Sequence, residues 1–200
     1  METQEHKGYT IELTQDPYPD NPRDWDNLGT MVCWHPRYIL GDEQPKCDPT
    51  EYKFEMLPVL MQFAIEDNDN WAMGAKWLDK NYIMLDLHVY EHGGITMSTG
   101  SFSCPWDSGQ VGFIYVSVED IKKEYGWKRL TRKRRQLIES YLRNEVKTYA
   151  MYLEGDVWSI RITDPDGNEI EDCSGFYGYS ETIDECKKII DRELTQARAS

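Results

Sequence analysis

The chain has 200 residues, of which 40% are hydrophobic and 12% aromatic, enough apolar material for a folded core and evidence against disorder. Its formal net charge of −14 at pH 7 disfavours nucleic acid and the inner membrane leaflet as partners and favours basic ones, or serves solubility alone. No run approaches the about eighteen apolar residues of a membrane span, so we expect one domain, residues 1–200, in the cytoplasm and without membrane contact.

Charge is distributed unevenly along the chain. Residues 1–110 hold 19 acids and 7 bases, a net charge of −12, whereas residues 121–147 hold 10 bases and 3 acids, a net charge of +7. The chain therefore carries one basic stretch in an acidic background. Its five cysteines include no Cys-x-x-Cys pair and the chain starts with the polar string METQEHKGYT, so we expect free thiols in a reducing compartment.

The first fifty residues combine a strand with a long irregular segment. Apolar and polar residues alternate over Gly8–Thr14, which predicts a strand. Residues 15–50 are rich in Pro, Asp and Asn and are interrupted by the apolar piece Thr30–Trp34. Long irregular stretches in a compact domain are functional or disordered, and the Trp and Leu content here favours an ordered segment packed on the domain.

Helical spacing of apolar residues first occurs over Thr50–Ile65, although Pro58 is unfavourable in a helix interior. The longest helix is expected over Leu130–Leu153, with Gly155 as its stop. Shorter helices are expected over Trp71–Asp79, from the capping signal Ser117-x-x-Asp120 to Gly126, and from the capping box Thr182-x-x-Glu185 onward.

Five further strands, one of them Ile95–Gly100, form two predicted hairpins and a central strand. Tyr82–His92 alternates cleanly, and a three-residue loop that pairs Glu91 with Ile95 and Val89 with Met97 keeps its apolar residues on one face. The other strands are expected over Val111–Ser117, Val157–Thr163 and Glu169–Phe176, the last two joined by the turn DPDGN. Together, the predicted helices and strands indicate an α+β fold with a mostly antiparallel sheet and helices packed on one face.

The polar face of the strand Tyr82–His92 is one candidate site. Asp86, His88 and Tyr90 point to the same side, and the predicted register places His88 opposite Ser98. Such a patch could bind a ligand, and Asp86 and His88 with His92 offer metal-ligand chemistry. The alternative is the solvated outer face that antiparallel sheets commonly have, and we assign no metal site.

The loop that starts at Cys104 places a thiol, a carboxylate and a hydroxyl close together in Cys104, Asp107 and Ser108. Nucleophilic catalysis would need a base within hydrogen-bond reach, and His35, His88 or His92 could supply it. The alternative is a rigid turn in which Asp107 binds backbone amides and Trp106 is packed.

A second loop of similar composition contains Trp25, Asp26 and Asn27. A Trp needs partners that remove it from water and an Asp needs hydrogen bonds, so we expect this loop and the Trp106 loop to lie near each other. Residue types that can bind zinc lie nearby, at Cys33, His35, Asp42 and Cys47, but their spacing does not match a zinc site.

The start of the longest predicted helix is unusually basic. Arg132, Lys133, Arg134 and Arg135 follow Arg129, although cations at a helix N-terminus oppose the helix dipole by about 0.3–1 kcal/mol each. Either acidic parts of the fold neutralise residues 129–135, or these residues contact an anion such as RNA.

Four strings resemble a family of small proteins carried by bacteriophages, prophages and plasmids: PRDWDNLGTMVCWHPRYILGD at residues 22–42, HGGITMSTG at 92–100, CPWDSGQVGFIYV at 104–116 and GFYG at 175–178. The resemblance implies a mobile-element accessory protein that works in the bacterial cytoplasm, and it implies no catalytic residue. Small acidic proteins of that origin often block host defence by binding the nucleic-acid channel of a nuclease complex or by engaging its RNA.

Two functions remain open, neither with an assigned cofactor. The first is an inhibitor of a CRISPR or restriction system that binds a host defence protein or ribonucleoprotein through an acidic surface. The second is a small enzyme, with catalytic candidates Asp86, His88, Cys104 and Asp107, or a small-ligand-binding protein. The binding candidates are Trp25, Asp26, Asn27, His88, Tyr90, Trp106, Asp107 and Ser108.

Overall fold

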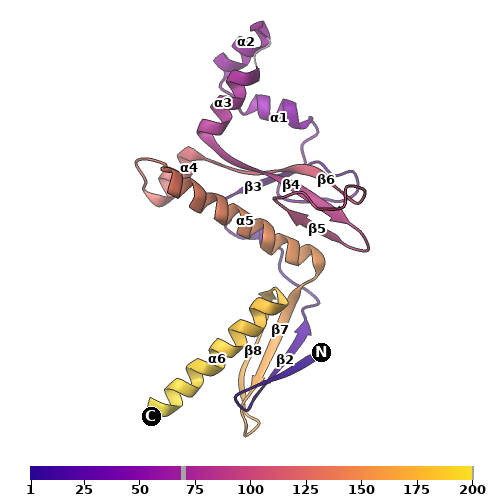
Figure 1. Ribbon diagram of the computed structural model, residues 1–200, viewed down its shortest axis with the longest axis vertical. Helices are drawn as coiled ribbons and strands as arrows, with labels where there is room; N and C mark the ends of the chain where they lie inside the picture. The colour runs from indigo at the N-terminus through magenta and orange to yellow at the C-terminus, as the bar shows by residue number, and fades with distance from the viewer. Residues whose placement is uncertain (69–70, 200) are drawn as a thin grey trace. The chain divides into compact units, whose positions relative to one another are not determined.

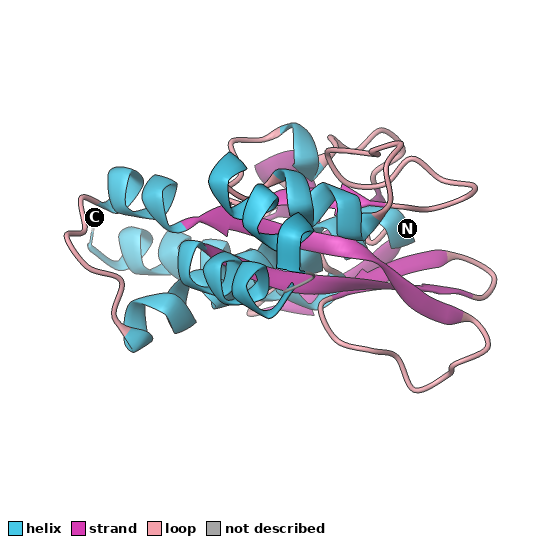
Figure 2. Ribbon diagram, turned by 90° about the horizontal axis from the view of Figure 1, so that it is seen from above, coloured by secondary structure: helices cyan, strands magenta, loops and turns pink. Residues whose placement is uncertain are grey.

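The computed structural model describes residues 1–68 and 71–199, and within these ranges the chain has six α-helices, eight β-strands and one 3-10 turn, η1 (Pro22–Asp24). The α+β class is therefore confirmed, and the two element types are distinguished by colour in Figure 2. All strand pairs are antiparallel, but they form two four-stranded sheets where the sequence suggested one.

The chain divides into two compact units. Unit 1 comprises Met1–Asp24 and Thr148–Ser200, and unit 2 comprises Trp25–Lys147. The irregular segment 15–50 is thus shared between the units, and it contains a short strand, β3 (Thr30–Cys33), at its apolar piece.

Unit 1 contains a sheet with one face covered by a helix. Its strand order is β1-β2-β7-β8, with β1 at Glu2–His6, β2 at Tyr9–Gln15, β7 at Val157–Thr163 and β8 at Glu169–Tyr177. The helix α6 (Tyr179–Ala199) packs on this sheet. The buried residues between them are Ile11, Leu13, Ile160, Ile162, Ile183, Cys186 and Ile190.

The beginning of α6 corrects the predicted capping box. The helix starts at Tyr179, and Thr182 is buried inside it, where its hydroxyl donates to the carbonyl of Gly178 at 2.7 Å. The carboxylate of Asp156 instead accepts a hydrogen bond from the backbone N–H of Tyr179 at 2.9 Å. A capping partner that is distant in sequence leaves no local signal, which explains the error.

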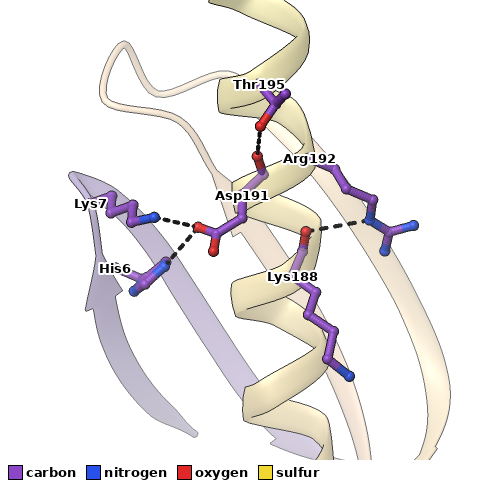
Figure 3. A network of polar contacts seen from close by, with 6 residues as sticks. All are labelled: His6, Lys7, Lys188, Asp191, Arg192 and Thr195. Atoms are coloured by element: carbon purple, nitrogen blue, oxygen red, sulfur yellow. Dashed lines mark hydrogen bonds and ion pairs between the residues drawn. The ribbon is translucent and has the colours of Figure 1, made fainter.

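Strand β1 was not predicted, because its sequence ETQEH is polar on both faces. Its hairpin with β2 turns at Lys7 and Gly8, both of which have positive φ. The carboxylate of Asp191 on α6 holds this turn, accepting from Lys7 Nζ at 2.7 Å and lying 3.1 Å from His6 Nε2 (Figure 3). An edge strand with little apolar content is thus fixed by polar contacts.

Unit 2 contains the second sheet, in the order β3-β6-β4-β5. Its other strands are β4 (Tyr82–Glu91), β5 (Ile95–Ser98) and β6 (Ser108–Ser117). The helices are α1 (Pro49–Glu55), α2 (Val59–Asn68), α3 (Trp71–Asn81), α4 (Val118–Tyr125) and α5 (Arg132–Glu154), the last of which continues into unit 1.

Helices lie on both sides of this second sheet (Figure 1). On the α5 side, Gly29 lies so close to Leu142 and Ile114 that a Cβ would approach them within 2.5–2.8 Å. On the other side, the ring of the buried Phe113 contacts Trp34 and Tyr52, with ring centroids 5.7 and 5.9 Å apart.

The predicted register of the β4–β5 hairpin is confirmed. Glu91 pairs with Ile95 and Val89 with Met97, and Gly93 supplies the left-handed residue with φ 71°. Val89 and Met97 are buried as expected. The helix expected over 50–65 is interrupted at Pro58, so that α1 and α2 are separate helices.

Candidate functional site

The two Trp-Asp loops lie at opposite ends of β6, which corrects the expectation that they are neighbours. Trp106 lies two residues before the start of β6 at Ser108. Trp25 precedes β3, whose first residue, Thr30, pairs with Tyr115 near the end of β6. Because a strand rises about 3.4 Å per residue, the loops are separated by roughly 20–25 Å along β6. They are two separate candidate sites.

The first site, the hairpin-end cluster, consists of Glu91, His92, Cys104, Asp107 and Ser108. The N–H of Glu91 donates to the carbonyl of Asp107 at 2.8 Å, which ties the loop to the end of β4. The Oδ2 of Asp107 lies 3.5 Å from Cys104 Sγ and 3.4 Å from His92 Nδ1. The hydroxyl of Ser108 donates to the carbonyl of Cys104. Four of the candidate site residues therefore belong to one fixed loop: Cys104, Trp106, Asp107 and Ser108.

The order of groups in this cluster differs from that of a nucleophile–base pair. A catalytic thiol needs an imidazole within hydrogen-bond reach, with the carboxylate beyond it. Here the carboxylate of Asp107 stands between Cys104 and His92, and the His92 side chain is 73% exposed. The contacts tie the loop together, but within the described part of the chain the Asp107 carboxylate contacts the side chains of Cys104 and His92 and not the backbone amides that the rigid-turn alternative expected.

A hydrogen-bonded group of His35, Arg37 and Glu91, which no sequence pattern indicated, lies next to this cluster. Nδ1 of His35 accepts from the backbone N–H groups of Arg37 and Tyr38 at 3.2 and 3.1 Å. The proton is therefore on Nε2, which donates to Glu91 Oε1 at 2.6 Å, and Arg37 binds the other oxygen of Glu91. The His35 side chain is only 4% exposed, so this pair anchors the 34–38 segment to the hairpin.

The polar face of β4 is divided among different environments. Asp86 is exposed, whereas Nδ1 of His88 is buried and has no hydrogen-bond partner among the described residues. The ring of Tyr90 contacts the rings of His92 and Phe102, whose centroids are 6.2 and 5.7 Å from its own. Within residues 1–68 and 71–199 no group of three His, Cys, Asp or Glu side chains could hold a metal ion.

Trp106 is the most exposed of the three aromatic binding candidates, which are Trp25, Tyr90 and Trp106. Its side chain is 93% exposed, whereas Trp25 is 48% exposed. The sequence alternative of a packed Trp106 is therefore wrong. The loop is fixed by Cys104, Asp107 and Ser108, and its largest apolar side chain points into solvent.

The second site, the α4 pocket, lies at the other end of β6 and has a volume of about 390 Å³. Asp26 and Asn27 line it, as sequence analysis proposed for a binding site, and the other lining residues are Leu28, Asp120, Lys123, Glu124 and Tyr125. The Glu145 carboxylate on α5 fixes the loop by accepting from the N–H of Leu28 at 2.9 Å. Burial raises the pKa of the Tyr125 hydroxyl above its usual value, so it remains protonated.

The basic residues at the start of α5 divide into two pairs. Arg135 points inward and binds Asp79 and the carbonyl of Tyr82, both at 3.1 Å. Arg134 lies 4.5 Å from the ring centroid of Trp127. Arg132 and Lys133 are exposed. Internal contacts therefore account for Arg134 and Arg135 only.

Comparison with known proteins gives no match to a protein-family model, to a curated protein or to a solved structure. Among the described residues, no helix has the length and apolar character needed to cross a bilayer.

Proposed function

We propose that this chain is a protein-binding protein whose central contact is Trp106, and that its partner is a nuclease complex of a bacterial defence system. The observation that carries the proposal is the 93% exposure of Trp106 on a loop fixed by hydrogen bonds. A large exposed apolar side chain on a rigid loop binds with little loss of conformational entropy, and Trp is enriched among the residues that dominate binding energies.

The charge of the chain supports a basic partner. The net charge is −14, and residues 1–110, which include the Trp106 loop, carry a net charge of −12. Such a field accelerates association with a positively charged surface and disfavours association between two copies of the chain. The nucleic-acid channel of a nuclease complex is a surface of that kind.

The identity of the host system rests on the resemblance to proteins of phages, prophages and plasmids. A protein of that origin would act in the cytoplasm of a bacterial host, where CRISPR and restriction complexes cleave invading DNA. Occupation of the channel by an acidic protein would prevent that cleavage.

Phage plating tests the proposal. Expression of the chain should restore plating by orders of magnitude in hosts that carry a CRISPR or restriction complex directed at the phage, and should change nothing in hosts without it. Trp106→Ala should lose this restoration, because truncation of a central Trp costs about 2 kcal/mol or more of binding energy. Trp25→Ala, at the other end of β6, is the matched control and should restore plating like the unaltered chain. Failure of the unaltered chain in every such host would contradict the defence-inhibitor function.

A further inference from the structure

The strongest basic feature of the molecule extends from the last turn of α4 to the first turn of α5. Residues 122–135 contain eight bases and one acid, Glu124, a net charge of +7 in a chain of net charge −14. Six of these bases are exposed: Lys122, Lys123, Lys128, Arg129, Arg132 and Lys133. We call these six residues, together with the stacked rings of Tyr125, Trp127 and Tyr141, the basic platform.

The basic platform is built around a stack of three aromatic rings. The rings of Tyr125 and Trp127 are 4.7 Å apart with an interplanar angle of 26°, and Tyr125 is also stacked with Tyr141 at 6.4 Å and 16°. Gly126 has φ 63°, which allows the chain to turn between the first two rings. The guanidinium of Arg134 lies over Trp127, so the stack holds a cation as well.

The stack remains accessible at two of its members, since Tyr125 is 36% and Tyr141 is 38% exposed. The six exposed bases form no ion pair with any other described residue, unlike Arg135, which binds Asp79. Bases without internal partners beside partly exposed aromatic rings are the combination that single-stranded nucleic acid uses, with phosphates on the cations and bases on the rings.

We propose that the basic platform binds single-stranded nucleic acid, independently of the protein contact made by Trp106. The acidic background favours a single strand over a duplex or a membrane, because the basic platform is flanked by Glu119, Asp120 and Glu124. Charges beyond about 8 Å are screened at physiological salt, so a flexible strand can follow the basic residues while a broad anionic surface also meets the acids.

Fluorescence anisotropy with labelled 15-mers of U and of dT, and with a 15-base-pair DNA duplex, tests this inference on the full chain. We expect both single strands to bind more tightly than the duplex, with log affinity falling by about 0.7 per phosphate contact for each unit of log salt. Tighter binding of the U 15-mer than of the dT 15-mer would identify RNA as the ligand, and the reverse order would identify DNA.

The double variant Arg132→Glu/Lys133→Glu should weaken binding of the single strands by about tenfold or more and reduce the salt dependence. Acids are favourable in the first turn of a helix, so this variant is expected to fold. The matched control is Lys76→Glu/Lys80→Glu on α3, which makes the same change in net charge at exposed positions and should retain binding.

Stacking is tested separately by Tyr141→Leu, which should weaken single-strand binding while leaving the helix intact. Trp106→Ala should bind the strands normally, which separates this inference from the protein contact. Absence of single-strand binding at low salt, an equal loss in the α3 control, or tighter binding of the duplex or of anionic phosphatidylserine vesicles would overturn the proposal.

Discussion

Trp25 and Trp106 lie at opposite ends of β6: Trp25 precedes β3, which pairs with the second half of β6, and Trp106 lies two residues before the first residue of β6. The hairpin-end cluster and the α4 pocket therefore share a strand but no side chain. Substitutions at the two ends should act additively, since sites more than about 10 Å apart without common partners rarely couple. Variants of Trp106 and variants of the basic platform should therefore affect protein binding and nucleic-acid binding separately.

Gly112 is required by the approach of β3 to β6. A Cβ at Gly112 would lie 1.9 Å from the carbonyl oxygen of Val32, which is backbone and cannot move aside. Gly112→Ala should therefore lower the free energy of unfolding by about 3 kcal/mol or more. Gly109→Ala is the control on the same strand, because a Cβ there meets no atom within 4 Å. Urea unfolding checks both, and equal midpoints for the two variants would contradict the strand pairing.

Asp156 connects the end of α5 to the start of α6 in unit 1. Its Oδ1 accepts from the indole N–H of Trp158 at 2.6 Å and from the N–H of Tyr179 at 2.9 Å. Asp156→Ala leaves both donors without this acceptor and should cost about 2 kcal/mol of stability. Asp156→Asn retains an acceptor oxygen and should cost less, and Asp166→Ala, at an exposed turn, should cost nearly nothing. Thermal unfolding followed by circular dichroism measures the loss of stability in the three variants. A larger loss in Asp166→Ala than in Asp156→Ala would refute the role of Asp156 as an acceptor.

The five cysteines should differ in their reaction with iodoacetamide. Burial raises the pKa of the Cys186 thiol to about 11, and its side chain is fully buried between α6 and the unit 1 sheet. At pH 8 only about one thiol in a thousand would be the reactive thiolate. Cys104, which is half-buried in the hairpin-end loop, should be labelled well before Cys186. Mass spectrometry of labelled peptides measures the rates, and equal rates would show that the α6 core is open.

The contact between the β1–β2 turn and α6 should weaken in acid. The hydrogen bonds from Lys7 and then from His6 lower the pKa of the Asp191 carboxyl below its usual value. The stabilisation is therefore complete above the unfolded-state pKa of about 3.9 and is lost as the pH falls through the lower folded-state value. The protection of the His6 amide, measured as its exchange rate relative to the intrinsic rate at each pH, should fall over that range, whereas Asp191→Asn should already show low protection at pH 6. Exchange in Asp191→Asn as slow as in the unaltered chain would exclude this contact.

The sequence predicted those elements that are determined by residues close together in the chain. The alternation in β4 and the spacing of Gly93 were sufficient for the β4–β5 register. The single helix predicted over 50–65 was wrong, because Pro58 separates α1 from α2. Contacts between distant residues were not predictable: Asp156 with Tyr179, and His35 with Glu91, join segments that carry no mutual signal. The separation of the two Trp loops followed from strand order, which composition does not encode.

Equilibrium binding of the purified chain to the nuclease complex of a host in which it restores plating tests the central claim most directly. Trp106→Ala should weaken that binding by about 30-fold or more, the loss expected from about 2 kcal/mol, while Trp25→Ala should change it less than twofold. The association rate should fall with added salt, because the acidic chain is steered toward a basic surface. Equal dissociation constants for the unaltered chain and for Trp106→Ala would contradict the proposal that Trp106 is the central contact.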